Sequence, residues 1–141
     1  MTIDLPSEQT KLSGHWIQRG FLAISVLFNL CLVAQLLTVG LAVFYDSTWW
    51  HIHVWLVRGY GGLVVLLLAL LFINPFPQKI KMLTGGLVTL LTLQFITGHL
   101  NHPLHLGILH PLLGFLLFTS STTLIHRSWH EVFDDSDPVV N

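Results

Sequence analysis

Charged side chains are scarce in this 141-residue sequence: only 9% of its residues are charged, and the net charge is −1 with histidine neutral. The few basic residues form no stripe, which argues against nucleic-acid binding. There is one cysteine, Cys31, so no disulfide can form within the chain. The sequence has no serine nucleophile motif, no phosphate-binding loop and no carboxylate pair suited to acid–base catalysis. These absences disfavour hydrolytic chemistry.

Apolar residues, by contrast, make up 52% of the chain, and its mean hydropathy is +0.70, which is typical of a protein embedded in a bilayer. Four segments are long and apolar enough to cross about 30 Å of hydrocarbon as helices. They cover residues 21–45, 49–73, 80–99 and 104–126. Asn74-Pro75-Phe76-Pro77 separates two of them because proline lacks the amide proton that a helix needs. The sequence therefore predicts an all-α integral membrane protein, a four-helix up-down-up-down bundle.

The chain outside these spans consists of short loops and two ends. We expect residues 1–18 to form a short tail, residues 19–127 the transmembrane domain and residues 128–141 an exposed acidic tail. Five of the six cations fall on the side that holds both ends. The positive-inside rule therefore predicts cytoplasmic termini, in the inner or an equivalent energy-transducing membrane. The opposite side then faces outward.

Histidines gather at that outer side. Six of the nine lie there: His51, His53, His99, His102, His105 and His110. A single histidine at a membrane interface needs no special explanation, because water can satisfy it. Six on one side are harder to explain in this way, since burying such groups without a partner costs free energy. We therefore expect at least two of them to bind a metal or a metal-centred cofactor.

His110 is the first ligand that helical spacing favours. It shares a helix face with Gly107 and Gly114, which would leave a flat slot beside the imidazole. Pro111 removes the hydrogen bond that would close on the Gly107 carbonyl, so we expect the helix to loosen or kink there. The glycines alone are equally compatible with close packing of membrane helices.

His51 is the second ligand that helical spacing favours. It shares a face with Trp55, Arg58 and Gly62, whereas His53 points the other way. An arginine within a span pairs with an anion or extends to the interface, and a porphyrin propionate would be a suitable anion. This places a candidate ligand and a candidate counter-ion on one face of the second span.

A faint internal repeat supports the same pair of ligands. Gln35, Thr38, Leu41 and His51 recur 59 residues later as Gln94, Thr97, Leu100 and His110. If a pseudo-twofold axis along the membrane normal relates the two helix pairs, His51 and His110 become equivalent axial ligands of haem b. Gln35 and Gln94 are then expected to orient the imidazoles, or else to act as ordinary interhelical hydrogen-bond partners. His53 and His99 are the alternative ligands.

Three motifs resemble a small bacterial four-helix membrane family of unknown function, over roughly residues 20–126. The motifs are VAQLLTVGLAVF, LQFITGH and HPLLGFLLF, and the matching positions are Gln35, Gly40, Gln94, His110, Pro111 and Gly114. The family's second helix usually carries a histidine with glycine four residues on, whereas Trp55 follows His51 and Val57 follows His53 at that spacing. The layout is also similar to four-helix b-type cytochromes and to the halves of haem A synthase, which implies bound haem.

The function predicted is that of a haem-binding membrane electron-transfer protein or a quinol-linked oxidoreductase. Three alternatives stay open: a chlorophyll-binding subunit, an accessory subunit of a larger membrane complex, and an enzyme that binds a metal directly through three or more histidines. The last would normally recruit carboxylates, and only Asp46 is near. Absorption spectra distinguish a protein that binds haem from one that binds chlorophyll and from one that binds neither pigment.

Overall fold

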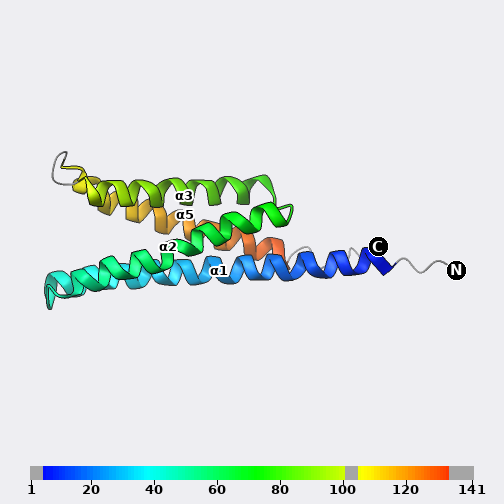
Figure 1. Cartoon of the computed structure of the whole chain (residues 1–141), viewed down its shortest axis with the longest axis horizontal. Helices are drawn as coiled ribbons and strands as arrows, with labels where there is room; N and C mark the ends of the chain where they lie inside the picture. Colours follow the sequence, from blue (N-terminus) through cyan, green and yellow to red (C-terminus); the bar gives the residue numbers. More distant parts are fainter. Residues whose placement is uncertain (1–4, 101–104, 134–141) are drawn as a thin grey trace.

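The computed structural model describes residues 5–100 and 105–133 of the chain, and all of its long elements are helices (Figure 1). The elements are α1 (Leu5–Phe44), α2 (Trp49–Ile73), α3 (Gln78–His99), the 3-10 helix η1 (Leu106–Leu109) and α5 (His110–Phe133). Four helical segments are long and apolar enough to cross a membrane. The prediction of an all-α four-helix bundle is confirmed.

The bundle consists of two antiparallel helix pairs. α1 packs most extensively along α2, and α3 along α5, while α1 also packs against α5 and α2 more sparsely against α3. Within the described residues the diagonal pairs, α1 with α3 and α2 with α5, make no close backbone contact. The start of α1 and the end of α5 lie at the same end of the molecule (Figure 1). We call the opposite end, with the α1–α2 turn, the turn end.

Two helices are longer than the apolar pattern predicts. α1 begins at Leu5, so the segment expected as a separate tail is helical from there, and it extends beyond the other helices (Figure 1). α5 continues to Phe133, into the expected acidic tail, while residues 134–141 lie outside the described part. The hydropathy pattern marks only the apolar stretch of a helix, and Pro6 does not prevent an early start because proline is accepted in the first turn.

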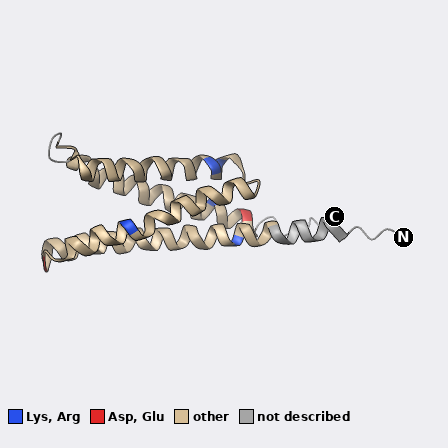
Figure 2. Cartoon of the chain, in the orientation of Figure 1, with Lys and Arg blue, Asp and Glu red and all other residues tan. Residues whose placement is uncertain are grey.

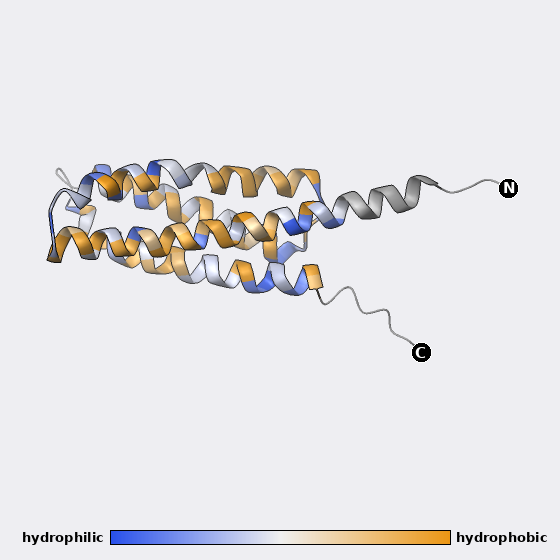
Figure 3. Cartoon of the chain, turned by 90° about the horizontal axis from the view of Figure 1, so that it is seen from below, coloured by the Kyte–Doolittle hydropathy of each residue, from blue (hydrophilic) through white to orange (hydrophobic). Residues whose placement is uncertain are grey.

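The core is narrow and apolar. Its largest fully buried apolar side chains are Phe21, Phe28, Leu67, Ile80, Leu87, Leu117, Leu124 and Val132. Phe28 and Tyr60 meet edge to face across α1 and α2, with ring centroids 5.6 Å apart. Many other large apolar side chains point outward: Leu36 is 74% exposed and Phe72 is 85% exposed. Apolar residues dominate the middle of the helices (Figure 3), as expected for a surface that faces lipid.

Polar side chains between the helices are mostly satisfied locally. Ser25, for example, donates to the carbonyl of Phe21, one turn earlier in α1. The amide of Asn29 instead crosses to α5, donating to Ser121 Oγ at 3.2 Å and to Thr122 Oγ1 at 3.1 Å. This is the direct side-chain link between the first and last helices near mid-bundle.

Candidate cofactor site at the turn end of the bundle

His53 on α2 is held by two residues of α1. Thr38 Oγ1 lies 3.2 Å from His53 Nδ1, and it donates its own proton to the Gln35 carbonyl at 2.7 Å. Because a hydroxyl has one proton, Thr38 Oγ1 accepts from Nδ1–H of the ring. Gln35 Nε2 also donates to the backbone carbonyl of His53 at 3.0 Å. The other ring nitrogen, Nε2, therefore carries a free lone pair.

His110 at the start of α5 is held in the same way by α3. Thr97 Oγ1 lies 3.4 Å from His110 Nδ1, and its proton is directed to the carbonyls of Leu93, at 2.9 Å, and Gln94, at 3.1 Å. Because the single hydroxyl proton of Thr97 goes to a carbonyl, Thr97 Oγ1 accepts from Nδ1–H of His110, and the lone pair of the ring is on Nε2. The contact is longer than that at His53, so the restraint on the ring is weaker.

The residues around His53 and those around His110 lie at the same end of the molecule and follow the same sequence pattern. Each set joins a Gln-x-x-Thr segment of one helix to the histidine of its paired helix. His53 and His110 are both half-buried and lie on diagonally opposed helices. The carbonyls of Gln35 and Gln94 also face the two rings. All four long helices thus contribute polar groups to this end of the bundle, which we call the polar layer.

Two buried oxygens in this layer have no protein partner. Gln35 Oε1 and Gln94 Oε1 are both buried and accept no hydrogen bond from the described residues. Buried polar atoms in native proteins nearly always have a partner, from protein, water or a ligand. Both oxygens could accept a hydrogen bond from a further group, as could Ser128 Oγ, which is buried without a partner elsewhere in α5.

The glycines near His110 pack against different side chains. A Cβ at Gly114 would lie 3.3 Å from Gln94 Nε2, so the slot expected beside His110 is filled by that amide. Gly98, which the sequence did not single out, lies against the ring instead, since a Cβ there would be 3.7 Å from His110 Cε1. Gly107 lies in η1, and its carbonyl accepts the His110 amide proton. Pro111 does not interrupt α5: the 3-10 helix η1 ends at Leu109 and α5 begins at His110, so Pro111 occupies the first turn, where proline fits.

The face of α2 that carries His51 points away from the bundle. His51, Trp55, Arg58 and Gly62 are all exposed, and a Cβ at Gly62 would meet nothing within 4 Å. Arg58 lies over the Trp55 ring, 5.8 Å from its centroid. Arg58 is therefore not directed at the polar layer, and the expected pairing with a propionate beside His51 does not fit this geometry.

The remaining histidines of this end lie apart from the layer. His99 is exposed, and its Nδ1 lies 2.9 Å from the carbonyl of Phe95 in its own helix. His105 is exposed and has a left-handed backbone, with φ of 52°. His102 lies outside the described residues. Within the described part of the chain, no group of three or more His, Cys, Asp or Glu side chains could hold a metal ion. A site made of three histidines alone is thus not formed there.

The internal repeat is present in the contacts, but its histidine pair differs from the one that a constant spacing predicts. Gln35 and Thr38 correspond to Gln94 and Thr97 at a spacing of 59 residues, whereas the histidine equivalent to His110 is His53, at 57. The connection from Thr38 to His53 is 15 residues long and that from Thr97 to His110 is 13. A fixed spacing holds within a helix but not across two turns of different length. Thr38 and Thr97 were part of the repeat, yet their role was not foreseen.

Comparison with known proteins gives one match. Residues 35–98 match the model of a family of unknown function, DUF6220. The matched segment runs from Gln35 through His53 and Thr97 and ends before α5, so it contains most of the polar layer but not His110. It is shorter than the expected range of 20–126. No curated protein and no solved structure matches the chain.

Proposed function

We propose that the protein is a haem b-binding electron-transfer protein of the membrane, in which His53 and His110 would hold the iron. One observation carries the proposal: in each of two imidazoles on opposed helices, Nδ1 contacts a threonine hydroxyl whose own proton is directed to a backbone carbonyl, which leaves Nε2 available to a ligand. A histidine that ligates a metal commonly donates its other ring proton in this way, which fixes its orientation. His53 replaces His51 as the preferred ligand because His51 is exposed on the outer face of α2.

The residues present fit such a group. The buried oxygens of Gln35 and Gln94, which accept no hydrogen bond from the described residues, could serve a group bound in this layer. Gly98 leaves room for the His110 ring. Iron porphyrin would supply reversible one-electron transfer, with a potential set by its axial ligands and by burial. Thr38 and Thr97 orient the two rings, and Gln35 fixes the backbone of His53. The apolar core of the bundle limits access by water.

The pairing of His53 with His110 favours haem binding over chlorophyll binding and over a purely accessory role. A chlorophyll magnesium needs one imidazole, so it gives no reason for two matched histidines. A purely accessory subunit gives no reason for two matched threonine–histidine contacts. The electrons would come from a quinol, from another subunit or from an external carrier, because the described chain contains helices alone and no nucleotide-binding fold.

We further propose that the turn end faces outward and that both termini are cytoplasmic. Lys79 and Lys81 at the start of α3, Arg19 and Arg127 gather at the other end of the bundle (Figure 2), which supports this orientation. A reporter fused after Asn141 should be active only in a cytoplasmic assay. Activity outside the cell membrane would contradict the orientation and leave the haem proposal intact.

The haem proposal is tested by purification in mild detergent and a dithionite-reduced minus oxidised spectrum. We expect a Soret band with sharp α and β bands. His53→Ala and His110→Ala should each abolish the low-spin spectrum or convert it to a five-coordinate one. His51→Ala, two residues from His53 but exposed, is the matched control and should leave the spectrum unchanged. Loss with His51→Ala and not with His53→Ala would overturn the ligand assignment, and absence of any haem after reconstitution would overturn the function.

A further inference from the structure

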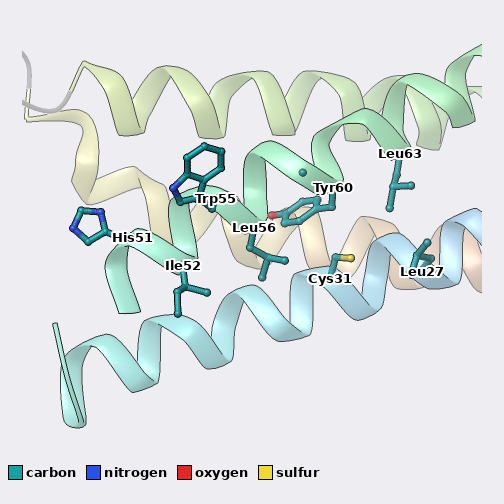
Figure 4. A pocket seen from close by; sticks show the side chains of 9 residues that line it. Leu27, Cys31, His51, Ile52, Trp55, Leu56, Tyr60 and Leu63 are labelled. Carbon is teal, nitrogen blue, oxygen red and sulfur yellow. The ribbon is translucent and has the colours of Figure 1, made fainter. Parts of the chain in front are cut away.

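A groove between α1 and α2 opens on the outside of the bundle at the turn end (Figure 4). Its volume is about 590 Å³, and its lining is apolar apart from His51 and the thiol and hydroxyl of Cys31 and Tyr60. His51 and Trp55 lie at one end of it and Leu63 lies near the other. Between His51 and Leu63 the groove follows α2 for about 18 Å at 1.5 Å per residue. That is close to half of the ~30 Å hydrocarbon thickness, the depth of one leaflet.

An exposed cation stands beside this groove. Arg58 is on the lipid-facing side of α2, nine residues after the helix begins, and its guanidinium lies over Trp55, which lines the groove. Helical side chains lean toward the N-terminus of their helix, so Arg58 leans toward the turn end and the nearer membrane surface. A cation within a span is costly unless it meets an anion or reaches the interface.

The described residues supply no such anion. The structure gives Arg58 no ion pair, and the acidic residue of the turn, Asp46, uses its carboxylate to accept the amide proton of Thr48 at 2.7 Å. The same hydrogen bond lowers the pKa of Asp46, so its charge is already stabilised in the turn. A second copy of the chain would bring no carboxylate at the depth of Arg58. An anion that pairs with Arg58 would therefore come from another kind of molecule.

We infer that this groove and Arg58 bind one anionic phospholipid from the leaflet at the turn end. The phosphate would pair with Arg58 near Trp55 and His51, and an acyl chain would lie in the groove along Ile52, Leu56 and Leu63. A phospholipid is the occupant that supplies both features together, a negative headgroup at the interface and an apolar chain one leaflet long. The inference is independent of haem binding, because both features lie on the outer face of α2.

The test is native mass spectrometry of the full chain in detergent, titrated with phosphatidylglycerol and, separately, phosphatidylcholine. We expect one phosphatidylglycerol to bind in preference to phosphatidylcholine. Arg58→Gln should weaken that binding by about tenfold, the effect of losing one charge-assisted hydrogen bond. Lys81→Gln removes the same charge at the other end of the bundle and should change nothing.

A second variant tests the groove without altering the charge. Gly59 lines the groove and a Cβ there would meet nothing within 4 Å, so Gly59→Leu should fold and fill the space meant for the chain. It should reduce phosphatidylglycerol binding, while Gly86→Leu, equally free of close neighbours but on α3, should not. Equal binding of the two lipids, no effect of Arg58→Gln, or a polypeptide or quinone in place of the lipid at this site would each overturn the inference.

Discussion

Thr38 on α1 and His53 on α2 are joined by a 3.2 Å contact between Oγ1 and Nδ1, although they are 15 residues apart across the turn. Since Thr38 gives its proton to the Gln35 carbonyl, the contact fixes the tautomer of His53. The corresponding contact of Thr97 with His110 reproduces it in the second helix pair. Two polar contacts therefore favour the ring proton on Nδ1 in both histidines.

The first prediction concerns that tautomer. Thr38→Val keeps the shape of the side chain but removes one acceptor and leaves only the Gln35 carbonyl facing the ring, so the Nδ1–H form of His53 should become less favoured. Nitrogen-15 NMR of histidine-labelled apo protein reads the tautomer directly and does not require haem. Thr89→Val is the matched control, because Thr89 is exposed and donates only to Gly85 in its own helix. An unchanged His53 signal in Thr38→Val would contradict the assignment.

The second prediction compares the two halves. The His110 contact is 3.4 Å long against 3.2 Å for His53, so Thr97→Val should perturb its histidine less than Thr38→Val does. In haem-loaded protein both variants should raise the midpoint potential, since an acceptor on Nδ1–H makes the ligand more basic and favours the oxidised iron. Redox titration should show a larger rise in midpoint potential for Thr38→Val than for Thr97→Val. The opposite order would mean that contact length does not govern the effect.

The third prediction concerns Gly114. Gly114→Val places a Cβ 3.3 Å from Gln94 Nε2 and further atoms beyond it, so the amide or the helix must move. We expect a loss of about 1–3 kcal/mol in the free energy of unfolding, typical of overpacking. Gly86→Val, where a Cβ has no neighbour within 4 Å, controls for helix propensity. Reversible unfolding in mixed detergent micelles measures both, and equal losses would mean that the Gln94 contact is unimportant.

The fourth prediction concerns the link between α1 and α5. Asn29→Leu removes the hydrogen bonds to Ser121 and Thr122 and should cost about 1 kcal/mol, the usual value for interhelical bonds in membranes. The same unfolding assay measures it. Thr119→Val, whose hydroxyl bonds only to Phe115 in its own helix, should be close to neutral. A neutral Asn29→Leu would show that apolar packing alone holds the pair together.

The fifth prediction follows from the position of Pro111. Because α5 begins at His110, Pro111 interrupts no turn of the helix, and Pro111→Ala should leave the stability within about 0.5 kcal/mol. Leu117→Pro, in the buried middle of α5, should instead abolish folding. A large change in helix content with Pro111→Ala, measured by circular dichroism, would contradict this prediction and support the loosened or kinked helix that the sequence predicts at Pro111.

The sequence by itself determined the four helices, because apolar runs longer than a bilayer is thick have few other structures open to them. It also marked the polar positions, since Gln35, Gln94 and His110 stand out in an apolar background. It could not decide between His51 and His53. The two lie about 160° apart on α2, and only the packing of that helix against its neighbours turns one inward. The same rotation carries Arg58 to the lipid face, and the unequal turns, which no helical periodicity constrains, shifted the repeat by two residues.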